Sequence, residues 1–284
     1  MIDSHGDFDM DQHDGRDGVS DMALRDALGR IGAQDPDTPL GDSLLLGLDT
    51  ETTGLKAGKD GIVSAALVLR DPAAGPEGDV AATWLIDPHV PISPGASAVN
   101  GFTDDYVAEH GEEPAGALER IASLIAVAQR KRVPLLAYNA PFDVAMLAGD
   151  LRRWGLPSMA ERMDAAGMAD DAGAADGAPW PDALIVDPLV IDRAVSKRKG
   201  SHSLENTAAY YGVVPNDEFH DARTDTVASL DLIAPMTRLF AQAGALTVGD
   251  LMDWHRAAYL DWRDSFNEWA RSKGRRQIGH GWFD

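Results

Sequence analysis

Residues 44–55 read LLLGLDTETTGL, an apolar run that ends in two carboxylates separated by one threonine. In an extended strand successive side chains alternate between the two faces, so Asp49 and Glu51 point the same way while Thr50 points the other. Two like charges on a buried strand repel each other and lose hydration. A bound divalent cation would offset this cost, because hard cations prefer carboxylate oxygens. On its own, the stretch is more simply explained as a solvated strand end that leads into a turn at Gly54.

The composition of the chain is strongly acidic and lacks cysteine. Its 284 residues carry a formal net charge of −21 and are 44% hydrophobic, which allows one large domain with a core and appendages. The net negative charge argues against a protein that coats nucleic acid, because the affinity of such a protein comes from lysine and arginine. No apolar run approaches the roughly 20 residues of a membrane span, and no signal-peptide pattern is visible. We therefore expect no membrane association and, without cysteine for disulfides, a cytoplasmic location.

Three parts of the chain differ in composition. Residues 1–42 open with a run rich in aspartate and glycine, and we expect an acidic, disordered leader. Residues 43–243 alternate strand-like and helix-like segments and form the expected α/β domain. Residues 244–284 hold a tryptophan-rich helix and a basic tail. The helix repeats apolar residues at helical spacing, namely Leu251, Trp254, Ala258, Trp262, Phe266 and Trp269. This stripe is typical of a packing face rather than of a base-stacking surface.

Apolar runs bounded by turn residues predict the strands of the domain. These runs lie at 43–49, 62–70, 80–87, 134–138 and 183–187. The second and third read as antiparallel neighbours, whereas strands and helices alternate after Gly111, so we expect a mixed sheet covered by helices. Amphipathic spacing predicts helices over 114–131 and 221–244. Asn139 is expected to cap the helix that starts near Pro141.

Two further carboxylates and a histidine are candidates for the same site as Asp49 and Glu51. Asp143 follows a short buried strand at the start of a helix, which in a parallel sheet faces the crevice beyond the strand ends. Asp225 lies in the first turn of another helix, and either acid alone would be an ordinary partner of the helix dipole. His220 precedes Asp225 by five residues, which on a continuous helix would turn the two side chains roughly 140° apart. His220 must therefore lie in the loop before the helix if both serve one site.

Three motifs in this order carry a resemblance to a known family. They read DTETTGL at 49–55, NAPFD at 139–143 and HDARTD at 220–225. Together they resemble the DEDDh branch of the DnaQ-like 3′–5′ exonucleases, over about residues 43–243. The resemblance implies an α/β, RNase H-like fold with a mixed five-stranded sheet flanked by helices, here with a C-terminal helical extension. It also implies two catalytic divalent cations, Mg²⁺ or Mn²⁺.

The resemblance assigns roles position by position. It makes metal ligands of Asp49, Glu51, Asp143 and Asp225, and a general base of His220. Carboxylates that hold two cations can together activate a water and stabilise both the phosphate and the leaving 3′-oxygen. A loop histidine suits the role of a proton acceptor near neutral pH, and it can swing in when substrate arrives.

Residues around the terminal nucleotide are assigned by the same resemblance. Thr52 and Leu55 would border that nucleotide, with Leu55 wedged near its base. Many relatives carry a histidine in the place of Asn100, and that histidine contacts the terminal nucleotide. Asn100 can still form hydrogen bonds but stacks less well on a base. Phe142 is a candidate neighbour, although core packing explains it equally well.

Positive charge is scarce in this chain and gathers in short clusters. Lys197, Arg198 and Lys199 form the cluster that is the first choice for contact with backbone phosphates, because the net charge of −21 must be overcome locally. Asp187 ends the last strand on the crevice side, but Pro188 follows it directly. We interpret Asp187 as structural, because an aspartate between a strand and a turn is common.

The combined pattern predicts an enzyme. We expect metal-dependent hydrolysis of the 3′ ends of single-stranded nucleic acid, DNA rather than RNA, with release of mononucleotides. If the protein proofreads, it would serve a DNA polymerase in trans. An exoribonuclease similar to RNase T or oligoribonuclease is the second reading, and a polymerase accessory without catalysis is the third. The complete set of acids with His220 disfavours the third, because a retired site has no reason to keep clustered charge.

Overall fold

The computed structural model describes residues 17–164, 178–215 and 219–283 of the chain. Its centre is a mixed five-stranded sheet in the order β3-β2-β1-β4-β5. The strands are β1 (Leu45–Thr52), β2 (Ile62–Arg70), β3 (Val80–Leu85), β4 (Leu135–Leu136) and β5 (Ile185–Val186). Each predicted strand is present, so the prediction of a mixed sheet is confirmed.

Strand β1 lies in the middle of the sheet and extends past its parallel neighbour. It pairs antiparallel with β2 from Leu45 to Thr52, but it pairs with β4 only at Leu46 and Gly47. The carboxyl-terminal half of β1 therefore has an open edge on the β4 side. The two halves of the sheet grow in opposite directions from β1, and such a switch point is the usual place for a ligand in an α/β sheet.

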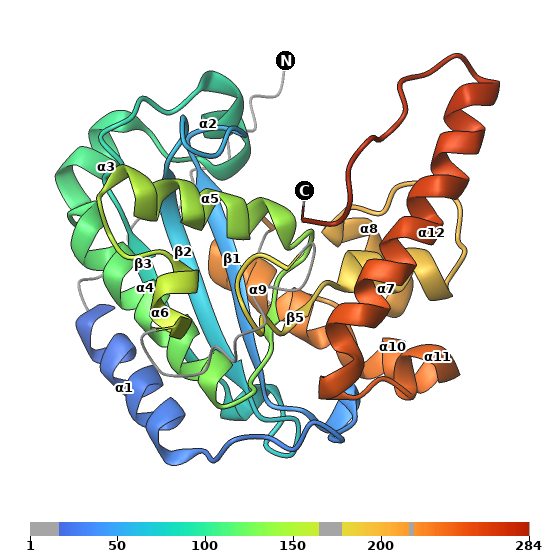
Figure 1. Ribbon diagram of the computed structural model, residues 1–284. Helices are drawn as coiled ribbons and strands as arrows, with labels where there is room; N and C mark the ends of the chain where they lie inside the picture. Colours follow the sequence, from blue (N-terminus) through green and yellow to red (C-terminus); the bar gives the residue numbers. More distant parts are fainter. Residues whose placement is uncertain (1–16, 165–177, 216–218, 284) are drawn as a thin grey trace, which may run out of the picture.

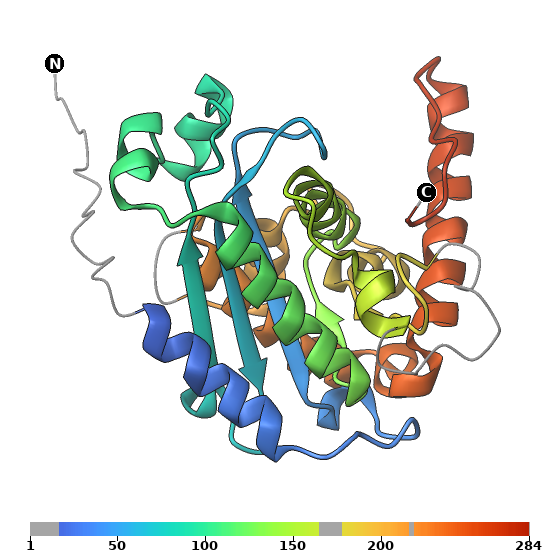
Figure 2. The same ribbon diagram turned by 60° about the vertical axis from the view of Figure 1, so that its left-hand side comes forward.

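Helices cover both faces of the sheet (Figures 1 and 2). One face carries α1 (Asp17–Arg30), α4 (Pro114–Arg130), α5 (Pro141–Arg153) and α6 (Met159–Asp164). The other carries α7 (Pro188–Val195), α8 (Leu204–Tyr211), α9 (Ala222–Asp231), α10 (Ile233–Leu239) and α11 (Ala241–Gly244). The short helices α2 (Pro94–Asn100) and α3 (Asp104–His110) flank Phe102, which with Val107 of α3 packs in a smaller core over the start of β2 and the end of β3. Short 3₁₀ turns are η2 (Leu40–Asp42), η3 (Pro76–Gly78) and η4 (Val248–Asp250).

Side chains of β1 alternate between the two faces, as predicted. Leu48 lies in the core beneath α4 and α5, and Leu45 lies in the core beneath α9 and α10. Asp49 and Glu51 continue the Leu45 face, whereas Thr50 continues the Leu48 face. The paired carboxylates thus point toward α9 at the end of the sheet where β4 has stopped.

A glycine lets α9 approach this face of β1. A Cβ atom at Gly47 would lie 2.5 Å from Thr226 Cγ2 and 3.0 Å from Leu230 Cδ1, both on α9. Atoms in proteins do not pack that closely, so any larger residue would displace the helix or its side chains. Because Asp225 is the neighbour of Thr226, the same close approach brings Asp225 to the carboxylates of β1.

The structure corrects the prediction of a disordered leader over residues 1–42. Helix α1 occupies part of this segment, and its Leu24 and Leu28 are fully buried against the sheet and α4. These leucines are one helical turn apart, and burying each side chain contributes roughly 1.5–3 kcal/mol. The acidic composition of the segment concealed this apolar pair. Residues 1–16 lie outside the described part of the chain.

The single helix predicted over 221–244 is divided into α9, α10 and α11. The break between α9 and α10 follows Asp231, four residues before Pro235. A proline lacks the N–H for the helical hydrogen bond, and its ring clashes with the carbonyl four residues earlier. Phe240 then adopts an extended conformation, with φ −124° and ψ 112°, and separates α10 from α11.

The C-terminal helix α12 (Leu251–Ser272) packs through the predicted stripe in its first half, where Leu251 is buried and Trp254, Ala258 and Trp262 pack against the core. Its buried residues include Leu251, His255 and Tyr259, whereas Trp269 of the tryptophan stripe is 44% exposed. Figure 1 shows the first half of α12 against the body of the protein and its second half standing away from it. The predicted packing face is therefore wrong for the end of the helix.

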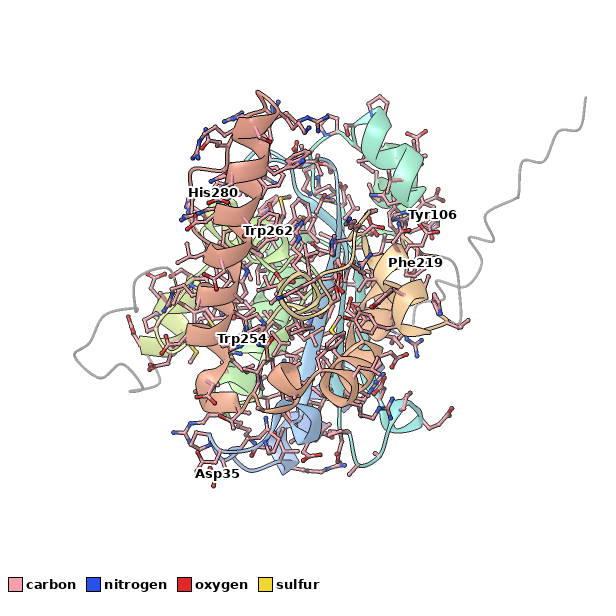
Figure 3. All side chains as sticks on the ribbon, turned by 90° about the vertical axis from the view of Figure 1, so that its right-hand side faces the viewer. Asp35, Tyr106, Phe219, Trp254, Trp262 and His280 are labelled. Carbon is pink, nitrogen blue, oxygen red and sulfur yellow. The ribbon has the colours of Figure 1, made fainter. Side chains whose placement is uncertain are left out.

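The basic tail after α12 folds back along the helix (Figures 1 and 2). Asn267 accepts a hydrogen bond from the N–H of Ile278 and donates one to its carbonyl, each at 2.8 Å. Near the end of the tail, Trp282 is buried and stacks on His255 with ring centroids 5.0 Å apart. Figure 3 shows Trp262 and His280 at neighbouring heights along this helix. Within the described residues, none of the helices combines the length and the apolar character that crossing a bilayer demands.

Candidate active site

Asp225 enters the site from the first turn of α9. The side chain of Asp221 caps this helix by accepting the Thr224 N–H at 2.9 Å. The carboxylate of Asp225 is buried, and the backbone N–H of His220 lies 3.4 Å from each of its oxygens. Burial raises the pKa of Asp225 to about 6, and the His220 N–H opposes that rise.

Asp143 enters the site from the first turn of α5, on the opposite face of the sheet. Its Oδ1 accepts a hydrogen bond of 2.7 Å from the hydroxyl of Thr50, the residue between the two carboxylates of β1. Burial raises the pKa of Asp143 to about 7, although the bond from Thr50 lowers it. Thr50 thus ties the acid of α5 to the strand that carries the other two.

The start of α5 is fixed by Asp187 and not by the predicted cap, Asn139. Asp187 is buried and caps α7, and it accepts the backbone N–H groups of Asn139 at 3.0 Å and Ala140 at 3.1 Å. Asn139 itself adopts φ 64°, a left-handed conformation that asparagine tolerates. The structural interpretation of Asp187 is therefore confirmed. Its hydrogen bonds also fix the turn that leads into Asp143.

The carboxylates of β1 carry the strongest perturbation. Burial raises the pKa of Asp49 well above its ordinary value, and the charges of Asp143, Asp225 and Glu51 raise it further. Burial and the charge of Asp225 raise the pKa of Glu51 to about 8, whereas a hydrogen bond with the Asn100 side chain lowers it. Without a cation, these groups cannot all be ionised at neutral pH except at a substantial cost in free energy.

The donor set fits hard divalent cations. Glu51, His220 and Asp225 each offer a ligand atom within 4.8 Å of the others. Asp49 adds a carboxylate to the same face of β1, and Asp143 adds another from α5. Carboxylate oxygens are the ligands that Mg²⁺ and Mn²⁺ prefer, and a cation would relieve the repulsion among these groups. The arrangement can therefore hold divalent cations.

His220 lies in the loop before α9, where the sequence requires it. Its side chain is exposed, and its backbone has φ 77°, which is uncommon for a residue other than glycine. Such strained positions concentrate at functional sites. The loop places the imidazole at the solvent side of Glu51 and Asp225, where it can reach a water or a cation.

The residues predicted to contact substrate differ in their surroundings. Leu55 is 83% exposed in the loop after β1, whereas Thr52 is buried and donates its hydroxyl to the Gly54 carbonyl. Asn100 is buried, and its amide donates a hydrogen bond to the Thr52 carbonyl at 3.2 Å. Its side chain also forms a hydrogen bond with Glu51. Phe142 is partly buried against the core beneath α5.

The three residues of the basic cluster at 197–199 differ in exposure and in their contacts. Lys197 and Lys199 are exposed. Arg198 instead pairs with the buried carboxylate of Asp192 at 2.8 Å and donates to the Thr207 hydroxyl. Its guanidinium is thereby committed to the fold, so only the two lysines keep the predicted role in phosphate contact.

Reasoning from sequence missed the residues that position the acids. Thr50 was assigned only to the opposite face of β1, and nothing in the local pattern shows that α5 would bring a carboxylate to that face. Gly47 was not singled out, although a glycine inside a strand signals a close approach of another backbone or helix. Asn100, which was expected to contact the substrate, holds the end of β1 through its hydrogen bond to the Thr52 carbonyl and lowers the pKa of Glu51.

Comparison with known proteins agrees with this geometry. The family model RNase_T, described as Exonuclease, matches residues 46–233. A DNA polymerase III subunit epsilon-like protein of Rhodobacter capsulatus is 28% identical over 230 residues, which cover 80% of this chain and 28% of the relative. The chain thus spans less than a third of the length of that relative.

Solved structures share the fold. The zinc-bound complex of Escherichia coli exonuclease I with single-stranded DNA matches with a TM-score of 0.55 and 19% identity, over 72% of this chain and 42% of that one. Its complex with a dT13 oligonucleotide matches with a TM-score of 0.53 and 20% identity, over 70% and 42% of the two chains. These matches confirm the RNase H-like sheet flanked by helices. Because the family model covers more than half of the chain, the protein belongs to this exonuclease family, and the resemblance to DnaQ-like 3′–5′ exonucleases is confirmed.

Proposed function

We propose that the protein is a metal-dependent 3′–5′ exonuclease that removes mononucleotides from single-stranded DNA. One observation carries the proposal: acids from β1, α5 and α9 converge at the open edge of β1, and each has a pKa above its ordinary value. Titratable groups perturbed in this way are typical of catalytic sites. Family membership supplies the reaction class, the hydrolysis of phosphodiester bonds at a chain end.

Each acid has a defined task in this proposal. Asp49, Glu51, Asp143 and Asp225 would hold two divalent cations, Mg²⁺ or Mn²⁺. Bound cations of this kind activate the attacking water and neutralise charge on the phosphate and the leaving 3′-oxygen. The chain itself orients the ligands: the Thr50 hydroxyl fixes one oxygen of Asp143, and the Asn100 amide steadies Glu51.

His220 would act as the general base. Its ring lies at the solvent side of Glu51 and Asp225, and a histidine can accept a proton near neutral pH. The Asp225 carboxylate receives the His220 backbone N–H and so keeps the loop close to the site. Exposed Leu55, beside Thr52 and Phe142, would border the terminal nucleotide, and Lys197 and Lys199 would contact phosphates farther along the strand.

The substrate and partners follow from the relatives. Exonuclease I of similar fold binds single-stranded DNA, and the matched relative is a polymerase III epsilon-like protein. We therefore place single-stranded DNA before RNA as substrate, and a DNA polymerase as a partner in trans if the protein proofreads. Residues 43–243 would form the exonuclease unit and 244–284 an extension of it, in a cytoplasmic protein.

The test is a gel of 5′-labelled DNA and RNA oligonucleotides incubated with Mg²⁺, with Mn²⁺ and with excess chelator. We expect the DNA to shorten one nucleotide at a time with either cation, and no cleavage in chelator. A circular single strand serves as the control and should remain intact. Cleavage of the circle, or full activity in chelator, would refute the proposal, and faster loss of the RNA would reassign the substrate.

A further inference from the structure

A small cleft separates the start of α5 from the C-terminal extension. It has a volume of about 90 Å³, and its walls include Asn139, Pro141, Arg193, His280 and Trp282. Pro141 precedes Asp143 by two residues, a rise of about 3 Å along a helix. The cleft therefore adjoins the carboxylates, and one of its walls is the helix that supplies a metal ligand.

Arg193, at the wall formed by α7, forms no ion pair with a carboxylate of the described residues. Its Nε is buried and has no hydrogen-bond partner in the described part of the chain. Other arginines of low exposure pair with a carboxylate: Arg70, Arg153 and Arg198 do so, and Arg256, whose Nε also lacks a partner, does so through Nη1. Burial lowers the pKa of Arg193 below its ordinary value, as expected for a charge that has lost solvent without gaining a partner.

Packing against Trp262 does not satisfy this guanidinium. The Arg193 Cζ atom lies 3.9 Å from the centroid of the Trp262 ring, a cation–π contact that covers one face of the group. All five N–H donors of an arginine lie in the plane of the guanidinium, so stacking uses none of them. The contact instead orients the donors, and it leaves them available for an anion that enters the cleft.

Asp187 lines the same cleft but does not serve as that anion. Asp187 attracts the positive charge of Arg193, but its oxygens already accept the N–H groups of Asn139, Ala140 and Leu189. Trp282 adds a fourth donor at 3.4 Å. A planar guanidinium is suited to paired hydrogen bonds with a phosphate, and the small cleft admits such a group more readily than a base.

We propose that Arg193 binds a backbone phosphate of the substrate strand on the 5′ side of the bond that is cut. The proposal rests on the exonuclease function proposed above, because an enzyme that removes the 3′-terminal nucleotide leaves every other phosphate on that side. Beyond the cleft, α12 continues the surface: Trp262, Phe266 and Trp269 follow one another with centroids 5.7 and 5.5 Å apart, and Arg275 lies over Trp269. A row of aromatic rings with a cationic group at each end is a suitable platform for a single strand.

Binding without cleavage tests this assignment directly. The probe is dT12 with a 5′ fluorophore, titrated in chelator over a series of salt concentrations and followed by anisotropy. Arg193→Met keeps the aliphatic stem against Trp262 and removes the charge, so we expect about 5- to 10-fold weaker binding and a log–log salt slope smaller by roughly 0.7. Arg193→Lys should restore most of the slope. Arg238→Met, an exposed arginine of α10 outside the cleft, is the matched control and should bind as the wild type does.

A minimal substrate separates this inference from the proposed function. The p-nitrophenyl ester of thymidine 5′-phosphate carries only the phosphate that is attacked, so Arg193→Met should hydrolyse it at the wild-type rate while losing activity on dT12. If the wild type hydrolyses neither compound, the exonuclease proposal fails, and the binding series still decides the role of Arg193. Wild-type affinity and salt slope in Arg193→Met would overturn the inference. Thermal melting checks folding, and Arg193→Gln replaces Arg193→Met if the latter is unfolded.

Discussion

At the scale of single residues, the acidic side chains at one end of the sheet determine how metal binding and stability are related. Asp49, Glu51, Asp143 and Asp225 are destabilised as anions by burial and, at β1, by one another. A cation converts this repulsion into attraction, so the site stabilises the fold when it is filled and weakens it when it is empty. Natural sites of this kind trade stability for function.

The first prediction contrasts an acid with the histidine by thermal melting with and without Mn²⁺. Asp49→Asn should raise the melting temperature of the metal-free protein by at least about 2 °C, the shift that 1 kcal/mol produces in a protein of this size. It should also abolish most of the stabilisation by Mn²⁺, because a ligand is lost. His220→Ala should keep that stabilisation and lower kcat by about 10² to 10⁴, the cost of a missing general base.

An exposed acid is the control for this contrast. Asp105→Asn lies at the surface of α3, and its melting temperature should follow that of the wild type with or without Mn²⁺. Loss of the Mn²⁺ effect in His220→Ala would show that the imidazole is a metal ligand, as its position beside Glu51 and Asp225 permits.

The resemblance of the three ordered motifs to the exonuclease family predicted the four acids and His220 as site residues, and the alternation of a strand predicted that Asp49 and Glu51 share a face. The supporting contacts could not be predicted in the same way. Thr50 reaches Asp143 across 93 positions of sequence, and Asp187 holds Asn139 across 48. No local pattern encodes such contacts, since they depend on how helices and strands pack.

At the scale of elements, the distance between β1 and α9 decides whether the acids meet. Local signals predicted the strands, because a buried strand is a short apolar run, but they failed at α1 and at the breaks within 221–244. In α1, two buried leucines outweigh an acidic context. At the break between α9 and α10, the effect of Pro235 outweighs a continuous amphipathic pattern.

The second prediction concerns the glycine at this contact. Gly47→Ala should destabilise the protein by about 1–3 kcal/mol, because the new Cβ would overlap Thr226 and Leu230. It should also reduce activity roughly 10²-fold if Asp225 moves by about 1 Å. Chemical denaturation and the labelled-DNA assay measure the two effects.

Gly116→Ala is the matched control in α4. An added Cβ there meets nothing closer than Arg120 Nη1 at 3.5 Å. Alanine is favoured over glycine within a helix by roughly 0.5–1 kcal/mol, so this variant should be slightly more stable and fully active. Equal behaviour of the two variants would show that Gly47 does not control the approach of α9.

At the scale of the whole molecule, the C-terminal extension is connected to the site at Asp187, through buried His255 of α12 and through Trp282 of the tail. His255 Nδ1 donates to the Leu251 carbonyl at 2.8 Å, and Nε2 accepts the Asp187 backbone N–H at 3.1 Å. Asp187 in turn fixes the start of α5. The neutral imidazole therefore links α12 to the turn before Asp143, and burial lowers its pKa to about 4.

The third prediction follows from this neutral histidine. Its folded pKa of about 4 lies below the ordinary value near 6.5, so between these limits the unfolded chain binds more protons than the folded one. The contribution to stability is complete above about pH 6.5 and is lost as the pH falls toward 4, up to roughly 3 kcal/mol. The carboxylates with raised pKa act in the opposite sense, because their protonation in the folded state favours folding as the pH falls.

The variant His255→Gln isolates the effect of the histidine, because glutamine can keep a donor and an acceptor. In denaturant unfolding from pH 7 to 4.5, the wild type should lose more free energy of unfolding than the variant. Parallel curves would mean that His255 is not held neutral, and the link between α12 and the site would then need another basis.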